Sequence, residues 1–179
     1  DGESGGCSDI VVRNNVLWCD WGKNLEVWSG HKDSHIHSVV FENNYLIHVC
    51  MTAVSVDTWY GSESVAVENI VYDNISVYAD EDVYAPQYQS SDTQFFDYDL
   101  RLPYKDRTLL YIAVGKIGKK LPNQAVDSDA DVSGYHITYR NIAFHGITEH
   151  GGHAKISVLP EHVSLSDIFY DGKSLLGES

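Results

Sequence analysis

The chain has 179 residues, 43% of them hydrophobic, so it is long enough for one packed domain and too apolar for a disordered tail. Twelve Lys and Arg against 26 Asp and Glu give a formal net charge of −14, which argues against nucleic acid and anionic membranes as partners. No apolar run approaches the roughly 20 residues that a membrane-spanning helix requires. Cys7, Cys19 and Cys50 allow one disulfide at most, and we expect three buried thiols.

A five-residue motif recurs along the chain, with apolar residues at its first and third positions and Asn at its fifth. Copies begin at Ile10, Val39, Ile70, Ile137 and Ile168, and the last has Gly172 in place of Asn. The steps between them are 29, 31, 67 and 31 residues, so the period is near 30 with one long repeat. A second apolar segment follows each of the first four copies, at 25–28, 54–57, 112–115 and 156–159. All these segments alternate with a period of two, and two short strands in each repeat predict an all-β, parallel β-solenoid.

The Asn residues of the motif have a structural explanation. Asn tolerates the left-handed backbone conformation that turns a chain between strands, and its amide can bond to the same residue of the next coil. We therefore expect Asn14, Asn43, Asn74 and Asn141 to form a buried ladder. Asn74 also begins a glycosylation sequon, which we discount because a ladder position would be buried.

The spacing predicts one β-solenoid over residues 1–179, with four to five coils. The long third repeat carries two loop insertions, near 80–107 and 116–133, where Asp, Tyr, Ser and Pro are common. The first coil has no polar cap, which a solenoid needs at each end. We expect the chain to be the C-terminal part of a longer solenoid, with its first coil covered by the N-terminal part of the same protein or by another copy.

Residues 8–18, followed by 20–22 and 25–27, resemble coils of polygalacturonase-like proteins with the pectin-lyase fold. In that family a strand ending in Asn is followed by a turn, a Gly and a short strand along the substrate groove. The resemblance implies a right-handed parallel β-helix that acts on a polysaccharide. It also implies a secreted, periplasmic or cell-surface location.

The signature motifs of polygalacturonases are missing from this chain. It has no Asn-Thr-Asp, Asp-Asp, Gly-His-Gly or Arg-Ile-Lys, and the last of these would fall on Glu26-Val27-Trp28. Since recognition of a uronate needs a cation, this departure and the acidic composition favour a neutral glycan. Dextranase-like hydrolases, which share the β-helix fold and cleave neutral glucans, are a neighbouring family.

Hydrolysis of a glycosidic bond commonly uses two carboxyl groups that flank it. If 25–28 and 54–57 stack in register, four side chains point outward on coils about 4.8 Å apart: Glu26, Trp28, Ser55 and Asp57. Asp20 lies in the turn before the first of these strands. The candidate catalytic residues are therefore Asp20, Glu26 and Asp57. The alternative is that they have no catalytic role, with Asp20 a turn residue and Glu26 and Asp57 solvated positions on strands.

Aromatic side chains cluster around the same strands, where they could stack against sugar rings. The candidate substrate-binding residues are Trp21, Trp28, His48, Trp59 and Tyr60. Among these, His48 is also a candidate acid or base of the groove. Trp18, in contrast, is expected in the core.

No metal site is expected. His31, His35 and His37 are closely spaced, but no Cys or carboxylate pattern completes a zinc site. Residues 127–131 resemble the start of a calcium loop, but its turn Gly and final Glu are missing. We expect no cofactor, with calcium at this loop as the alternative.

These patterns predict a glycoside hydrolase that processes a polysaccharide bound in a groove along the β-helix. A non-catalytic glycan-binding or adhesive β-solenoid is the alternative. A polysaccharide lyase is a third reading, weakened because no convincing Lys, Arg or calcium site lies in the predicted groove. Two carboxyl groups about 5–9.5 Å apart in an aromatic-lined groove favour hydrolysis, and aromatic residues without such a pair favour binding.

Overall fold

The computed structural model describes residues 4–18, 24–29, 33–49, 53–58, 64–78, 108–114, 136–150, 155–159 and 164–176. Most of these residues form strands, and none of them is helical. The strands are β1 (Ser4–Arg13), β2 (Val16–Trp18), β3 (Leu25–Ser29), β4 (Asp33–Ile47), β5 (Val54–Thr58), β6 (Ser64–Tyr78), β7 (Thr108–Val114), β8 (His136–His145), β9 (Thr148–His150), β10 (Lys155–Leu159), β11 (Ser164–Tyr170) and β12 (Lys173–Ser174). The predicted insertions at 80–107 and 116–133 lie outside the described residues.

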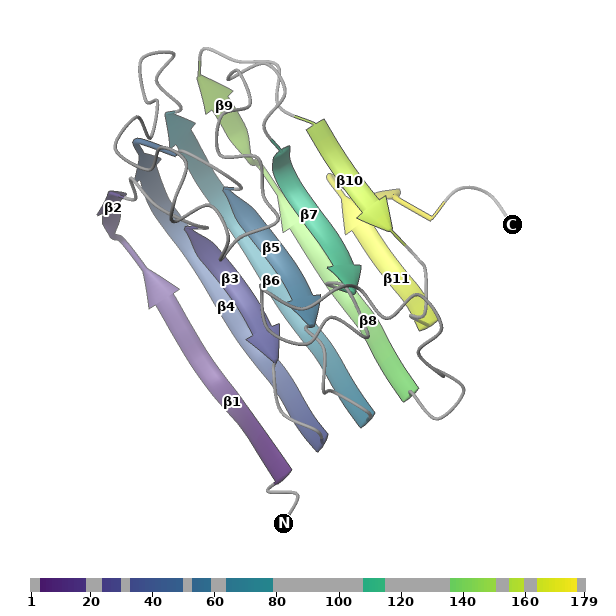
Figure 1. Ribbon diagram of the computed structural model, residues 1–179. Helices are drawn as coiled ribbons and strands as arrows, with labels where there is room; N and C mark the ends of the chain where they lie inside the picture. Colours follow the sequence, from purple (N-terminus) through teal and green to yellow (C-terminus); the bar gives the residue numbers. More distant parts are fainter. Residues whose placement is uncertain are drawn as a thin grey trace, which may run out of the picture.

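The strands form two sheets. The larger has the order β1-β4-β6-β8-β11-β12, with β2 beside β4 and β9 beside β6, and the smaller has the order β10-β7-β5-β3. Every pairing described is parallel except that of β11 with β12. Figure 1 shows the smaller sheet over one face of the larger, with the strands of the two sheets pointing in opposite directions. The predicted all-β fold with parallel strands is confirmed.

The long strands of the larger sheet contain residues with positive φ, which recur in pairs five residues apart. The pairs are Asp9 and Asn14, Ser38 and Asn43, Asn69 and Asn74, Asn141 and Gly146, and Asp167 and Gly172. Each such residue interrupts the alternation of the strand, so that the residues two before it and one after it face the same side. The buried positions of β6 are accordingly Val65, Val67, Ile70, Tyr72, Ile75 and Val77. The predicted left-handed conformation of the motif Asn residues and of Gly172 is confirmed.

The fourth copy of the motif was placed wrongly by the sequence pattern. Ile137 pairs with Val65, and the residue that pairs with Ile70 is Ile142, five residues later. Asn141 is therefore the counterpart of Asn69 and not of Asn74. The error arises because each time the chain crosses the larger sheet it contains two consecutive five-residue segments with the same pattern. Each segment ends in a residue with left-handed backbone conformation.

The core lies between the two sheets. Phe41, Tyr72 and Phe144 stack in a ladder, with ring centroids 4.7 and 5.0 Å apart and interplanar angles of 13° and 12°. The hydroxyl of Tyr72 donates to the Ser55 carbonyl oxygen at 3.0 Å, and the Thr58 and Tyr139 hydroxyls bond to each other, so both tyrosines tie the larger sheet to the smaller.

Most positions expected to face inward do so. Those that are buried are Leu25, Val27, Val39, Phe41, Val54, Val56, Ile70, Tyr72, Ile137 and Tyr139. Val12 is half-buried against the core, whereas Ile10 is 37% exposed because β1 is the edge strand of its sheet. The side chains of Ile112, Val114, Ile156 and Val158 lie outside the described part.

The predicted Asn ladder splits into two shorter ones. Asn74 donates to the Oδ1 atom of Asn43, and Asn141 donates to that of Asn69, each at 2.7 Å. Both bonds are exposed, because the left-handed residue points its side chain away from the core. The expectation that Asn74 is buried is therefore wrong, and so is the reason given for discounting its sequon.

One buried Asn was not anticipated. Asn44 is fully buried, its Nδ2 atom donates to the Val12 carbonyl oxygen at 2.9 Å, and its Oδ1 atom accepts from the backbone and side-chain nitrogens of Asn15. The Asn44 amide thus provides hydrogen-bond partners for backbone groups of Val12 and Asn15, where the chain passes from β1 to β2. Cys7, expected to be buried, is an exposed free thiol on the same edge strand.

Candidate functional site

The predicted groove lies on the outward side of β3 and β5. The two strands pair in the expected register, with Glu26 opposite Ser55 and Trp28 opposite Asp57. Along β3 the exposure alternates, so that Glu26 and Trp28 are exposed while the residues between and beside them are buried. Trp28 is 44% exposed, which leaves much of its ring accessible to a ligand.

The neighbouring strand departs from this pattern at Ser55, which was expected to be exposed and is fully buried. Ser55 is therefore not part of an open outward surface, and the prediction of four outward side chains on β3 and β5 is wrong at this residue. Asp57 is described only by its backbone, which places it directly beside Trp28.

Four candidate site residues, Asp20, Trp21, Trp59 and Tyr60, lie outside the described residues.

His48 is described, and its ring stacks on Trp18 with centroids 3.5 Å apart and an interplanar angle of 23°. Trp18 is 59% exposed, so its expected place in the core is wrong. Trp18 lies on the outward side of β2, because side chains alternate along the strand and Leu17 faces inward.

A second surface, which the sequence did not suggest, is a polar groove on the outward face of the larger sheet. Small residues, histidines and hydroxyl groups line it: Gly5, Gly6, Ser8, Ser34, His35, His37, Ser64, Ala66, His136 and Thr138, with Asp33 and others. Gly6 is required here, because a Cβ atom at this position would overlap the His35 carbonyl oxygen.

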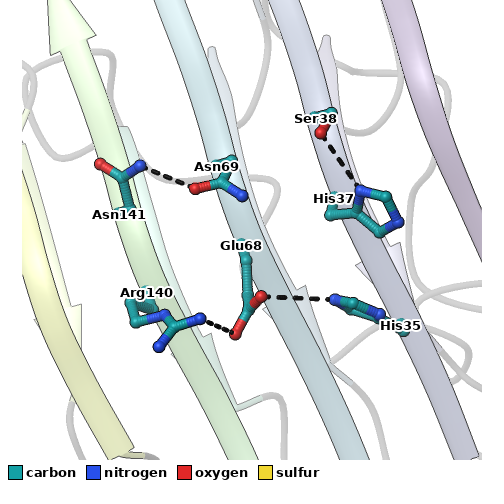
Figure 2. A network of polar contacts seen from close by, with 7 residues as sticks. All are labelled: His35, His37, Ser38, Glu68, Asn69, Arg140 and Asn141. Carbon is teal, nitrogen blue, oxygen red and sulfur yellow. Dashed lines mark hydrogen bonds and ion pairs between the residues drawn. The ribbon is translucent and has the colours of Figure 1, made fainter.

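Figure 2 shows the charged residues beside this groove, where Glu68 lies between Arg140 and His35. The Glu68 carboxylate is 2.9 Å from an Arg140 nitrogen and 3.4 Å from the Nε2 atom of His35. His37 bonds to the Ser38 hydroxyl, and its ring centroid is 4.5 Å from that of His35. The register explains the cluster, since His37, Glu68 and Arg140 occupy one cross-strand row.

This arrangement supplies hydrogen-bonding groups at fixed positions, but the Glu68 carboxylate is held by Arg140. In the described part of the chain, no three His, Cys, Asp or Glu side chains are arranged to hold a metal ion. The possible calcium loop at 127–131 lies outside that part. The sequence signal that could have indicated this groove is the pair His35 and His37, which alternate along one strand. The sequence alone does not show that Glu68 of the neighbouring strand lies beside them.

Compared with protein-family models, curated proteins and solved structures, the chain matches none. Among the described residues, no helix is both long and apolar enough to cross a membrane. The likeness to polygalacturonase-like proteins thus stays a prediction from the sequence.

Proposed function

We propose that this chain forms four to five coils of a right-handed parallel β-helix that binds a neutral polysaccharide along β3 and β5 and hydrolyses its glycosidic bonds. The observation that carries the proposal is the register of these strands, which places exposed Glu26 and Trp28 beside Ser55 and Asp57. Parallel strands that alternate between two facing sheets are what a β-solenoid requires. A secreted or surface location follows as part of the same proposal.

The spacing of the two carboxylate residues suits hydrolysis. Glu26 and Asp57 lie on adjacent strands and are offset by two residues along them. With strands about 4.8 Å apart and about 3.3 Å per residue, their Cα atoms are about 8 Å apart. Side chains that start from this separation can bring their carboxyl groups within the roughly 5–9.5 Å found in retaining and inverting glycosidases.

The neighbouring aromatic ring suits a sugar. Trp28 is exposed next to both carboxylate positions and offers an indole face against which the C–H face of a sugar ring can stack. The net charge of −14 disfavours a polyanionic substrate, so the proposed ligand is a neutral glycan.

The test is the release of reducing ends from soluble neutral polysaccharides such as dextran, β-glucan, mannan and xylan. Glu26→Gln and Asp57→Asn should each reduce turnover by at least about 100-fold, the low end for the loss of an acid or base. Asp73→Asn, an exposed carboxylate on the larger sheet, is the matched control and should leave turnover unchanged. Binding should survive in Glu26→Gln, since the shape of the site is retained.

Two outcomes would redirect the proposal. Normal turnover in both folded variants would remove Glu26 and Asp57 from the chemistry. Binding that is lost in Trp28→Ala, without hydrolysis by the unaltered chain, would favour the non-catalytic glycan-binding or adhesive β-solenoid. A lyase is disfavoured because the outward positions of β3, Glu26 and Trp28, supply no cation for an acidic glycan.

A further inference from the structure

Exposed aromatic rings also gather on the larger sheet, on strands that do not pair with β3. They lie where β2, the ends of β4 and β6, and β9 run side by side (Figure 1). We call the five residues concerned the aromatic strip: Trp18, Tyr45, His48, Tyr78 and His150.

The register gives the strip its shape. Trp18, Ile47, Tyr78 and His150 form one cross-strand row over four adjacent strands. Trp18 and Tyr78 are two strands apart, which is about 9–10 Å. The adjacent row on the same face contains Tyr45. Trp18 is 59% exposed, Tyr45 is 49% exposed and Tyr78 is 41% exposed.

The two outer rings are held in place by histidines. Trp18 stacks on His48 at 3.5 Å, and Tyr78 stacks on His150 at 4.3 Å with an interplanar angle of 6°. A ring fixed by stacking loses less conformational freedom when a ligand binds, so these rings are organised for binding before a ligand arrives. Their exposed parts remain open to solvent.

We propose that the aromatic strip is a second binding site, which holds a neutral glycan chain lying across β2, β4, β6 and β9. The proposal rests on the proposed function for its ligand class, but it assigns a separate surface. A chain of sugar rings fits a row of separated aromatic side chains, because the C–H groups of successive sugars can contact the parts of these rings that the histidines leave exposed. The imidazoles of His48 and His150 lie beside the platforms and can bond to sugar hydroxyls.

Charge and patterning favour a glycan over other ligands. The acidic chain repels polyanions such as nucleic acid. The row of Tyr45 runs from exposed Val16 to Ser76 and Thr148, so the strip carries hydroxyl groups beside its aromatic rings. A second copy of the chain is the competing occupant, which the experiment below separates.

The experiment is affinity electrophoresis of the 179-residue chain in gels containing dextran, β-glucan, mannan or xylan. Trp18→Ala should weaken binding about 2- to 10-fold, and Trp18→Ala with Tyr78→Ala should weaken it further. Trp28→Ala tests the proposed site on β3 in the same gels. The aromatic variants Trp18→Phe and Tyr78→Phe should retain most of the binding. Thermal unfolding confirms that each variant folds.

A measurement on the unaltered chain covers the case in which the double variant fails to fold. The indole N–H resonance of Trp18, assigned with Trp18→Phe, should shift on titration with oligosaccharides of the retained polysaccharide. An unmoved resonance at saturation would overturn the second site.

The remaining outcomes separate the two proposals. Normal binding by the double variant, with loss in Trp28→Ala, overturns the second site and leaves the proposed function standing. Loss in the double variant with normal binding by Trp28→Ala supports the strip and removes the β3 site. No retention of the unaltered chain by any of these polysaccharides overturns both. Loss of self-association in the double variant, measured by sedimentation with unchanged glycan binding, assigns the strip to a second copy instead.

Discussion

Tyr72 offers a sharp test of how the two sheets are joined. Its side chain is fully buried between Phe41 and Phe144, and its hydroxyl donates to the Ser55 carbonyl oxygen of the opposite sheet. Tyr72→Phe removes only the hydroxyl and keeps the stacked ring. Ser55 lies inside β5, which is paired on both sides, so its carbonyl oxygen keeps a strand hydrogen bond after the substitution.

The expected cost of Tyr72→Phe is therefore that of one intramolecular hydrogen bond, about 0.5–1.5 kcal/mol. For a chain of this size each kcal/mol lowers Tm by about 2–4 °C, so a fall of about 1–6 °C is expected. Tyr72→Ala also removes the ring from the ladder and should cost about 3–5 kcal/mol, the range for a buried aromatic side chain.

The assay is chemical and thermal unfolding of the two variants beside Tyr45→Phe. Tyr45 is 49% exposed, so loss of its hydroxyl should change the free energy of unfolding by less than about 0.5 kcal/mol. If Tyr72→Phe were as stable as Tyr45→Phe, the bond between the sheets would contribute nothing. If Tyr72→Ala were also neutral, the facing arrangement of the sheets would be refuted.

Three further substitutions test the corners, the edge and one titrating group. Asn74→Ala should be less stable than Asn74→Gly by about 1–2 kcal/mol in urea unfolding, because φ is 52° and both variants lose the same amide. Gly6→Ala should cost about 1–3 kcal/mol, or release β1 from β4 in hydrogen exchange, because the added carbon overlaps the His35 carbonyl. Burial raises the pKa of Tyr170 above its ordinary value of 10.0, and the carboxylates of Asp171 and Glu149 raise it further. The contribution of neutral Tyr170 to stability is therefore complete below pH 10 and is lost as the pH rises through the raised pKa of Tyr170. Above pH 10, the Tm of the unaltered chain should fall more steeply with pH than the Tm of Tyr170→Phe.

Each of these three has a clear contrary result. Equal stabilities of the Ala and Gly variants at position 74 would mean that the left-handed corner is not strained by a side chain. An unchanged Gly6→Ala would show that β1 and β4 are not packed as closely as described. Parallel alkaline losses in Tyr170→Phe and the unaltered chain would remove Tyr170 as the source of the pH dependence.

The fold class could be predicted from the sequence because its signals are local. Alternating apolar residues and Asn at the corners identify parallel strands, and the register of β3 with β5 followed from matching two short segments. The first left-handed residue of each pair is Asp9, Ser38, Asn69, Asn141 or Asp167, and the motif did not identify this position because these residues share no single type. A five-residue spacing of buried positions, alternating steps of two and three, was the signal that would have placed Asn141 beside Asn69.

The site was less predictable because exposure depends on neighbours that are distant in the sequence. Ser55 occupies an outward position by alternation and is buried nonetheless, while Trp18 is apolar and exposed. Glu68, Arg140 and His35 come from three strands, and only the register brings them together. Asp20, Trp21, Trp59 and Tyr60 remain predictions from the sequence.

The most direct test of the glycan-processing account is a crystal structure of Glu26→Gln with a neutral oligosaccharide that the unaltered chain cleaves. The account predicts a sugar ring stacked on Trp28 and a glycosidic oxygen between the side chains at positions 26 and 57. It would be contradicted by an oligosaccharide bound only elsewhere, with the outward face of β3 and β5 empty.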